Sequence, residues 1–180
     1  MSDLTFLNNT SYPPAITINA SDVVLDVHAH IITITSGTFG VEVVDAGAEI
    51  SNVVVRKGTL RNCNVPIDVS AYYFDVHDIT FRDLILDGAS AAGVQLYSSQ
   101  GAGIDASVYN INIANCAIYG GIYGSDDRDN GGDHFVDCIF NYQSLCPIFL
   151  RGNPNRTSIQ DLENLNTVIS QGTIATQTTP

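Results

Sequence analysis

The sequence has few charged residues and very few bases. Only 14% of its 180 residues are charged, and surface helices would need more Lys, Glu and Arg. Seven Lys and Arg stand against 19 Asp and Glu, so the formal net charge is −12. A polyanion would be repelled and would find few cations with which to displace its counterions. We therefore expect no nucleic acid partner.

Long apolar runs are also missing. No window reaches the roughly 18 consecutive apolar residues of a membrane span, so we expect no membrane insertion. The N-terminal segment Met1–Leu4 lacks the basic and apolar regions of a signal peptide. The location of the protein stays open, with a virion or an extracellular surface among the alternatives.

The four cysteines form no CxxC pair, and no histidine lies at a zinc-finger spacing from them. Cysteine is among the most buried residue types, so we expect buried free thiols. We expect no cofactor, with Ca²⁺ as the one candidate considered below. Cys116 and Cys138 share one position of the repeat described next, and we expect their sulfur atoms to be close.

An internal repeat is the strongest positive signal. Five segments begin and end with a large apolar residue five positions apart, and their starts are separated by 28, 26, 32 and 22 residues. They are Val27–Ile32, Val55–Leu60, Phe81–Leu86, Ile113–Ile118 and Phe135–Phe140. Repeats of this length indicate a solenoid.

A second signature follows each segment after a short turn. A Gly or Pro precedes residues that alternate in and out with the strand period of two. The copies are Gly40–Val43, Pro66–Val69, Gly93–Leu96, Gly121–Gly124 and Pro147–Leu150, with Ala15–Ile18 as an earlier copy. We divide the chain into a lead-in (1–14), a β-helix (15–152) and a C-terminal cap and tail (153–180).

One coil of short strands cannot bury its apolar face, but stacked coils bury a continuous column. We therefore predict an all-β fold, a parallel β-helix solenoid of about five coils with a short C-terminal cap or tail. A β-sandwich with coincidental spacing is the alternative. One interior column should hold Val27, Val55, Phe81, Ile113 and Phe135, and a second Ile32, Leu60, Leu86, Ile118 and Phe140.

The run Asn52–Asn62, with a version at Val24–Ile32 that lacks its Gly, resembles the pectin-lyase-like right-handed β-helix family. That family repeats an apolar-x-Asn-Gly-x-Ile run once per coil, followed by Gly-Ile-x-Val. The resemblance implies a right-handed solenoid and leaves function open, because the scaffold serves lyases, hydrolases, phage tailspikes and adhesins. The chain has fewer coils than family enzymes and lacks the Asn-Thr-Asp, Asp-Asp, Gly-His-Gly and Arg-Ile-Lys set of polygalacturonases.

Basic residues cluster on two adjacent coils. Arg56 and Arg82 share an outward repeat position, with His28 one coil earlier, so we expect a row of the three. A groove over Arg56 and Arg82 for an acidic sugar is one hypothesis, with Asp26, His28, Arg56 and Arg82 as candidate catalytic residues. Ordinary salt bridging is the alternative, since Lys57 and Asp83 share a column.

Residues 124–133 are the most polar stretch. Asp126, Asp127, Asp129 and Asp133 could supply oxygen ligands for Ca²⁺, and a solvated turn is the alternative. Family lyases use Ca²⁺ with an arginine base, so the resemblance singles out Arg128. His77 and His134 stand beside Asp78 and Asp133, which predicts surface hydrogen bonds.

Eight tyrosines accompany no tryptophan. Tyrosine stacks on sugar rings or anchors protein interfaces, so Tyr97 and Tyr123 join Arg56 and Arg82 as candidate ligand-binding residues. In the tail, Ser158–Leu165 fits either a short helix or an irregular final half-coil.

Three functions remain open. The sequence favours a non-catalytic structural or binding β-helix, such as a virion fibre, tailspike-like module or adhesin, with a glycan as a candidate ligand. A small polysaccharide lyase or glycoside hydrolase acting on an acidic glycan, and a lectin-like module that uses tyrosines, are the alternatives. A short solenoid has two open ends and little nearest-neighbour stabilisation, so we also expect a homo-oligomer, by analogy with β-helix fibres a homotrimer.

Overall fold

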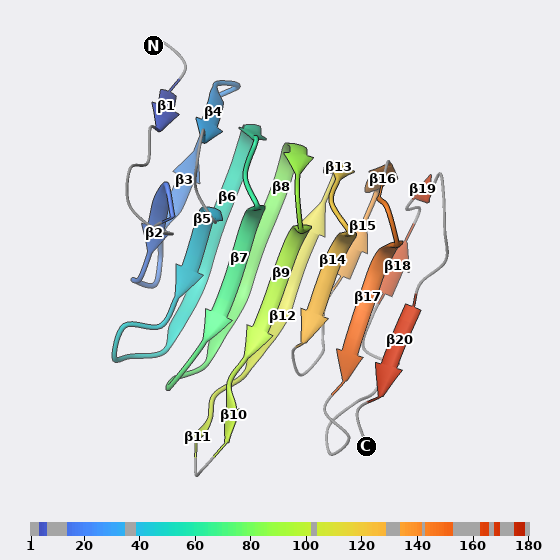
Figure 1. The fold of residues 1–180 in the computed structure, drawn as a ribbon. Coiled ribbons are helices and arrows are strands. Elements are labelled where there is room, and N and C mark those ends of the chain that lie inside the picture. The colour runs from blue at the N-terminus through green and yellow to red at the C-terminus, as the bar shows by residue number, and fades with distance from the viewer. Residues whose placement is uncertain are drawn as a thin grey trace.

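The computed structural model is an all-β parallel solenoid, whose strands stack side by side along one axis (Figure 1). It describes residues 4–6, 14–34, 39–101, 104–128, 134–141, 143–152, 163–165, 168–169 and 175–178. Side chains are described at residues 5, 14–34, 39–99, 106–123, 135–141, 143–145 and 148–149. The described residues contain no helix, and accordingly no helix long and apolar enough to cross a membrane.

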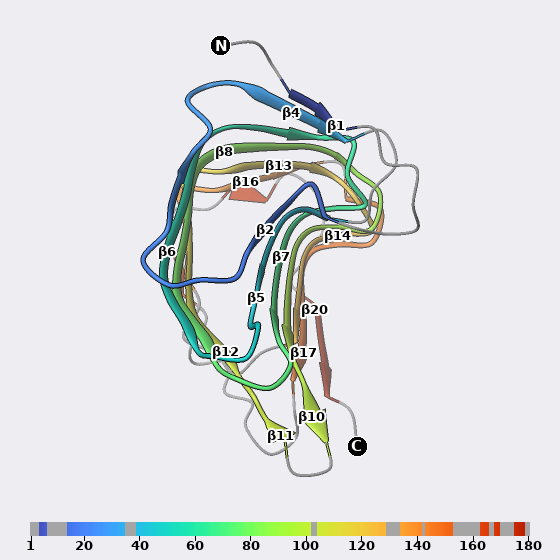
Figure 2. The same cartoon turned by 90° about the vertical axis from the view of Figure 1, so that its left-hand side faces the viewer.

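Sheet A is the larger of two parallel sheets, with eleven strands. They are β1 (Leu4–Phe6), β3 (Val24–Asp26), β4 (Ile31–Ile34), β6 (Ile50–Arg61), β8 (Val76–Ala89), β12 (Val108–Ala114), β13 (Ala117–Gly120), β15 (His134–Val136), β16 (Ile139–Asn141), β18 (Glu163–Leu165) and β19 (Val168–Ile169). Seen along the axis, the long strands β6 and β8 turn a corner, so sheet A has two faces (Figure 2).

Sheet B, with seven strands, closes the other side of the core. It contains β2 (Ile16–Ile18), β5 (Phe39–Val44), β7 (Val65–Ala71), β9 (Ala92–Ser98), β14 (Tyr123–Arg128), β17 (Cys146–Gly152) and β20 (Ala175–Thr178). A separate antiparallel pair, β10 (Gln100–Gly101) and β11 (Ile104–Asp105), extends from the end of β9. Each sheet turns one face to the core.

The interior columns follow the predicted register closely. Val55, Phe81, Ile113 and Phe135 are consecutive partners, and so are Ile32, Leu60, Leu86, Ile118 and Phe140. All nine side chains are at most 2% exposed. Branched and aromatic residues suit such a pleated, buried surface. The predicted parallel β-solenoid is therefore confirmed.

Two predicted alignments are wrong, one in the first interior column and one in the Gly/Pro signature. Leu25, not Val27, lies opposite Val55, because the first coil has two extra residues before Ile31 meets Thr59. In sheet B, Ser125, not Ile122, lies opposite Val94. Both errors lie at corners, where the number of residues per coil varies.

The bends of the coil use residues with positive φ. Asp22, Asn52, Asp78 and Asn110 form one such set, and Lys57, Asp83, Asn115 and Asp137 form a second. Asn and Asp tolerate the left-handed conformation better than other non-glycine residues. Stacked members hydrogen-bond across coils: Asn52 Nδ2 donates to Asp22 Oδ1 at 2.7 Å and Asn115 Nδ2 to Asp83 Oδ1 at 2.8 Å. These ladders fix where each coil turns.

The solenoid has about four turns, slightly fewer than the predicted five coils. At its C-terminal end, β18, β19 and β20 pair with β15, β16 and β17, so both sheets continue beyond residue 152. Glu163–Leu165 is strand β18, which favours the final half-coil over the short helix that the sequence also allowed.

Candidate functional site

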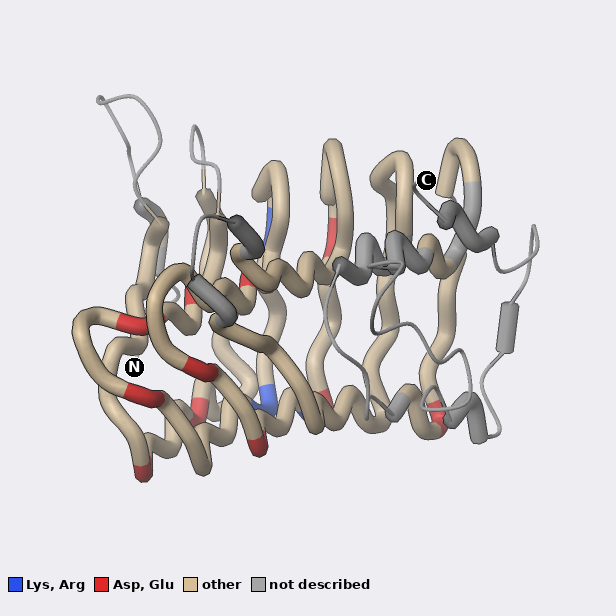
Figure 3. Tube along the Cα trace, turned by 90° about the horizontal axis from the view of Figure 1, so that it is seen from below, with Lys and Arg blue, Asp and Glu red and all other residues tan. Residues whose placement is uncertain are grey.

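Figure 3 shows the charges along the solenoid: the described Lys and Arg lie on neighbouring coils, while Asp and Glu are spread more widely. Arg56 and Arg82 are direct partners in β6 and β8, as predicted. His28 does not extend their row, because Asp26 is the partner of Arg56. The row therefore begins with a carboxylate that balances the arginine charge.

Asp26 is engaged in ion pairs. Its Oδ2 atom lies 2.9 Å from Arg56 Nε and 3.9 Å from Lys57 Nζ, and its Oδ1 atom accepts the His28 backbone N–H at 2.9 Å. Desolvation raises the pKa of Asp26, but the hydrogen bonds from His28 and Arg56 outweigh it and lower that pKa. A carboxylate held in this way is a poor proton acceptor.

Arg82 is paired as well, with its Nη1 atom 3.7 Å from Asp83 Oδ2. A groove of about 530 Å³ lies beside this corner, lined by His28, Ala29, Lys57, Gly58, Thr59, Asp83 and Ile85. Neither arginine lines it. The arrangement fits the salt-bridge alternative better than an open basic groove over Arg56 and Arg82.

The polar segment 124–133 begins as a strand, because residues 124–128 belong to β14. Asp126 aligns with Gln95 and Asp127 with Leu96, while Asp129 and Asp133 lie outside the described residues. Within the described residues, no group of three or more His, Cys, Asp or Glu side chains could hold a metal ion.

The outer face of sheet B carries a row of polar side chains. Thr17, Glu42, Asp68 and Gln95 occupy one register position on β2, β5, β7 and β9. The row continues through Asp126 to Phe149. Adjacent positions are about 4.8 Å apart, so carboxylates and an amide lie side by side.

Asp68 is the most unusual residue of this row. Although it points away from the core column, it is 0% exposed. Its Oδ2 atom accepts from Ser70 Oγ at 2.7 Å and its Oδ1 atom from Gln95 Nε2 at 3.0 Å. Burial, helped by the neighbouring Glu42 carboxylate, raises the pKa of Asp68 to about 7. The carboxyl group can therefore be protonated near neutral pH.

Glu42 is the second carboxylate of the pair. Burial raises its pKa too, against a hydrogen bond from Thr17 Oγ1 at 3.4 Å. Two like charges on adjacent strands disfavour each other's ionised form. The pair therefore provides both an acceptor and, when Asp68 is protonated, a donor of hydrogen bonds.

Two tyrosines border the carboxylates. The rings of Tyr72 and Tyr97 lie 5.9 Å apart at 48°, and Tyr97 is the register partner of Ser70. Burial and the nearby Asp68 and Glu42 carboxylates raise the pKa of Tyr72, while a hydrogen bond with Ser70 lowers it. We call this group the carboxylate–tyrosine cluster: Glu42, Asp68, Ser70, Tyr72, Gln95 and Tyr97.

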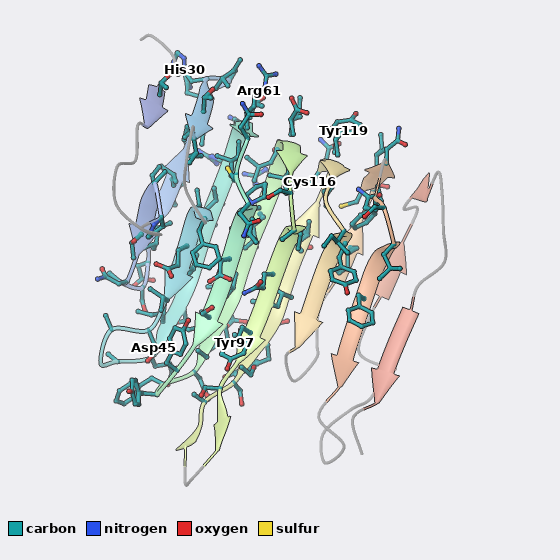
Figure 4. The ribbon with its side chains drawn as sticks, in the orientation of Figure 1. His30, Asp45, Arg61, Tyr97, Cys116 and Tyr119 are labelled. Atoms are coloured by element: carbon teal, nitrogen blue, oxygen red, sulfur yellow. The ribbon has the colours of Figure 1, made fainter. Side chains whose placement is uncertain are left out.

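A buried carboxylate holds the turn that presents Tyr72. Asp45 is 7% exposed and accepts the backbone N–H groups of Tyr72, Tyr73 and Phe74 at 2.6, 3.0 and 3.2 Å. Figure 4 shows Asp45 and Tyr97 at the same end of the sheet B strands. The cluster is thus supported by a fixed turn, while Tyr72 keeps 41% of its surface exposed.

The predicted ligand residue Tyr97 belongs to this cluster, and Tyr123 does not. Tyr123 stacks on Phe149, with ring centroids 4.7 Å apart and an interplanar angle of 9°. Phe149 follows Asp126 in the same row. The aromatic stack therefore lies on β14 and β17, beside strand β9, which carries Tyr97.

His77 forms a second cluster on sheet A. Its Nε2 atom lies 2.7 Å from Glu49 Oε1 and its Nδ1 atom 2.8 Å from Asp78 Oδ2. Its ring stacks on Tyr109 at 4.7 Å and 3°. The hydrogen bond predicted between His77 and Asp78 is confirmed; the side chain of His134 is outside the described set.

Apart from Tyr97, the residues of the carboxylate–tyrosine cluster were not predicted from the sequence. The signal for the cluster was the third position of the Gly/Pro signature, which reads Glu42, Asp68 and Gln95 in successive copies. Comparisons of the chain with protein-family models, with characterised proteins and with solved structures found no match in any of the three. The geometry of the cluster therefore has to support the functional proposal by itself.

Proposed function

We propose that this chain is a non-catalytic binding module of the pectin-lyase-like β-helix superfamily, of the tailspike-like or adhesin kind, and that it binds a glycan at the carboxylate–tyrosine cluster. The single observation that carries the proposal is the row of Glu42, Asp68 and Gln95 beside the Tyr72–Tyr97 pair. Sugar-binding sites need a few fixed polar groups next to apolar surface.

Each component of the cluster suits a sugar. The Glu42 carboxylate can accept hydrogen bonds from sugar hydroxyls, and the Gln95 amide can donate and accept. The buried Asp68 contributes by holding Gln95, whose Nε2 atom donates to it. Tyrosine offers a ring face for stacking together with a polar hydroxyl. The regular spacing of about 4.8 Å between strands repeats these groups along the axis. An extended, chain-like ligand fits such a row.

The ligand should be a neutral glycan rather than an acidic one. The row contains two described carboxylates, and the whole chain carries a charge of −12. Arg56 is tied to Asp26 and Arg82 lies close to Asp83, so no free basic row serves an anionic sugar in the described part of the chain. Like charges would oppose a uronate at Glu42.

Titration calorimetry against neutral oligosaccharides tests the proposal. We expect Tyr97→Ala and Glu42→Gln each to weaken binding at least about tenfold, or roughly 1.4 kcal/mol. Tyr109→Ala is the matched control, because it removes a tyrosine that stacks on His77 on the other sheet. Binding that is unaffected by Tyr97→Ala but lost in Tyr109→Ala would refute the assignment.

A glycoside hydrolase acting on such a glycan is the second candidate, and the pKa of about 7 at Asp68 favours it. A protonated acid beside a carboxylate is the pair that glycoside hydrolysis uses, with about 5–5.5 Å between carboxyl groups in retaining enzymes. Asp68 is 0% exposed, so we place binding first. Release of reducing ends by the wild type, abolished in Asp68→Asn while binding persists, would establish the hydrolase instead.

A further inference from the structure

The second face of sheet A carries an exposed apolar stripe. Ile31, Thr59, Ile85, Ala117 and Ile139 are consecutive register partners on β4, β6, β8, β13 and β16. Ile85 is 46% exposed and Ile139 is 42% exposed. Thr59 and Ala117 are smaller, so large and small side chains alternate along all five positions.

Grooves lie beside the smaller members of the stripe. The groove of about 530 Å³ includes Lys57, Thr59 and Ile85 in its lining. A second groove, of about 300 Å³, includes Ile85, Ala117 and Ile139. The stripe therefore has two projecting isoleucines and two hollows of the kind that an isoleucine fills.

Charged columns border the stripe on both sides. The corner column contains Lys57, Asp83, Asn115 and Asp137, at successive coils. The opposite column lies two residues after the stripe on each strand. It contains Arg61, Asp87, Tyr119 and Asn141. Figure 4 shows Arg61 and Tyr119 along this outer edge of sheet A.

If a second copy packs on the stripe with its solenoid axis pointing in the same direction, like charges face each other. A two-fold axis parallel to the solenoid axis places each coil opposite the same coil of the other copy. It also sets the corner column of one copy against the opposite column of the other. Lys57 then faces Arg61 of the other copy, and Asp83 faces Asp87. Like charges directly opposite are destabilising. A homotrimer built on this stripe around a parallel axis would bring the same columns together.

A second copy stacked in the opposite direction avoids this conflict. A two-fold axis along the strand direction sets each column against the same column of the other copy and reverses the order of the coils. With the axis midway between the coils of Asp83 and Asn115, Lys57 faces Asp137 and Asp83 faces Asn115. In the other column, Asp87 faces Tyr119.

The same register also matches the apolar side chains by size. Ile85 faces Ala117 and Ile139 faces Thr59, so each projecting isoleucine meets a hollow. Moving the axis by half a coil in one direction places Asp83 opposite Asp83, and in the other direction Asp83 opposite Asp137. Of these three registers, only the middle one keeps Asp83 away from another carboxylate, sets Lys57 opposite Asp137 and places an isoleucine at each groove.

We propose that two copies of this chain form an antiparallel homodimer through the apolar stripe. The interface is isologous, the same patch on both subunits, as two-fold symmetry requires. Ile139 of each copy occupies the groove beside Thr59 of the other, and the Lys57–Asp137 pair closes it at both ends. This inference is independent of the glycan proposal, which concerns sheet B.

Cross-linking tests both the dimer and its direction. Three coils of about 4.8 Å each separate Thr59 from Ile139 along the axis, while packed sheets lie about 10 Å apart. We expect a short bismaleimide to join Thr59→Cys to Ile139→Cys in a mixture of the two variants. Each is made in a Cys146→Ser background, and the other three cysteines, Cys63, Cys116 and Cys138, are buried free thiols. Neither variant alone should cross-link. Cross-linking of Thr59→Cys to itself, or of neither, would overturn the proposal.

Light scattering with charge reversal gives an independent readout. We expect a mass of twice the 19.3 kDa chain at micromolar concentration. Lys57→Glu should weaken dimerisation at least tenfold, and adding Asp137→Lys should restore it. Arg82→Glu, the same charge change outside the stripe and its columns, should leave it unchanged. A mass of one or three chains, or no rescue by the double variant, would contradict the antiparallel dimer.

Discussion

Asp68→Asn should stabilise the protein at alkaline pH. Burial and the Glu42 charge raise the pKa of Asp68 from 3.8 to about 7 in the folded state, so ionisation at high pH favours unfolding. Each pKa unit corresponds to about 1.36 kcal/mol, which gives on the order of 4 kcal/mol at full effect. Asparagine keeps the size and hydrogen-bonding capacity of the side chain without a charge.

The pH dependence identifies the cause. The folded state holds the proton that the unfolded state releases between pH 3.8 and about 7, so wild-type stability from this group falls as pH rises through that window. The gain in unfolding free energy from Asp68→Asn should be near zero below pH 4 and reach its plateau above pH 7. Glu42→Gln should reduce that gain, because it removes the like charge.

Urea denaturation of both proteins between pH 4 and 9 measures this difference. A uniform difference across the range would mean that Asp68 is not titrating in the folded protein. A loss of stability at pH 8 would mean that the negative charge of Asp68 is needed by its hydrogen-bond donors Ser70 and Gln95. Either result would refute the protonation argument.

Three further predictions concern the core, a corner and His77. Phe81→Ala should cost about 3–5 kcal/mol in denaturant unfolding, because Phe81 is 0% exposed; an unchanged midpoint would refute its central position. Gly58→Ala should lower the melting temperature, because an added Cβ would lie 2.4 Å from Val27 Cγ1 and 2.5 Å from Val27 Cβ, and a Val27→Gly background, which removes both atoms, should reduce the effect. Partial burial lowers the pKa of His77, but hydrogen bonds with Glu49 and Asp78 outweigh it and raise that pKa. His77→Gln should therefore cost about 0.2–1 kcal/mol below pH 6.5 and less as pH rises through the folded pKa; a cost that grows with pH would contradict this.

The fold could be predicted from the sequence because the residues that repeat are those that fill the core. Phe81, Leu86 and their partners recur at matched positions, and stacking in register follows directly from that spacing. The prediction failed at Val27, where the first coil contains two extra residues at a bend, and at Ile122, which follows a register shift between Tyr119 and Gly120. His28 and Ala29 both have positive φ before the first coil rejoins its neighbour, and Gly120 and Gly121 do the same near Ile122.

The candidate site was harder to predict than the core. Charge pairing depends on register, and the two-residue offset in the first coil placed Asp26, not His28, beside Arg56. The carboxylate row was visible as alternating polar residues, but alternation alone does not show that Asp68 is buried on an outer face. That burial arises from side chains of several coils, including Gln95 and Ser70, which lie far apart along the chain.

The most direct test of the glycan-binding account is an amide chemical-shift titration of the ¹⁵N-labelled protein with a neutral oligosaccharide. We expect saturable shifts at the backbone amides of Glu42, Asp68, Gln95 and Tyr97, with amides around Arg56 and Arg82 unmoved. Shifts confined to the Arg56 and Arg82 coils, or shifts that appear only with an acidic oligosaccharide, would contradict a neutral-glycan site on sheet B.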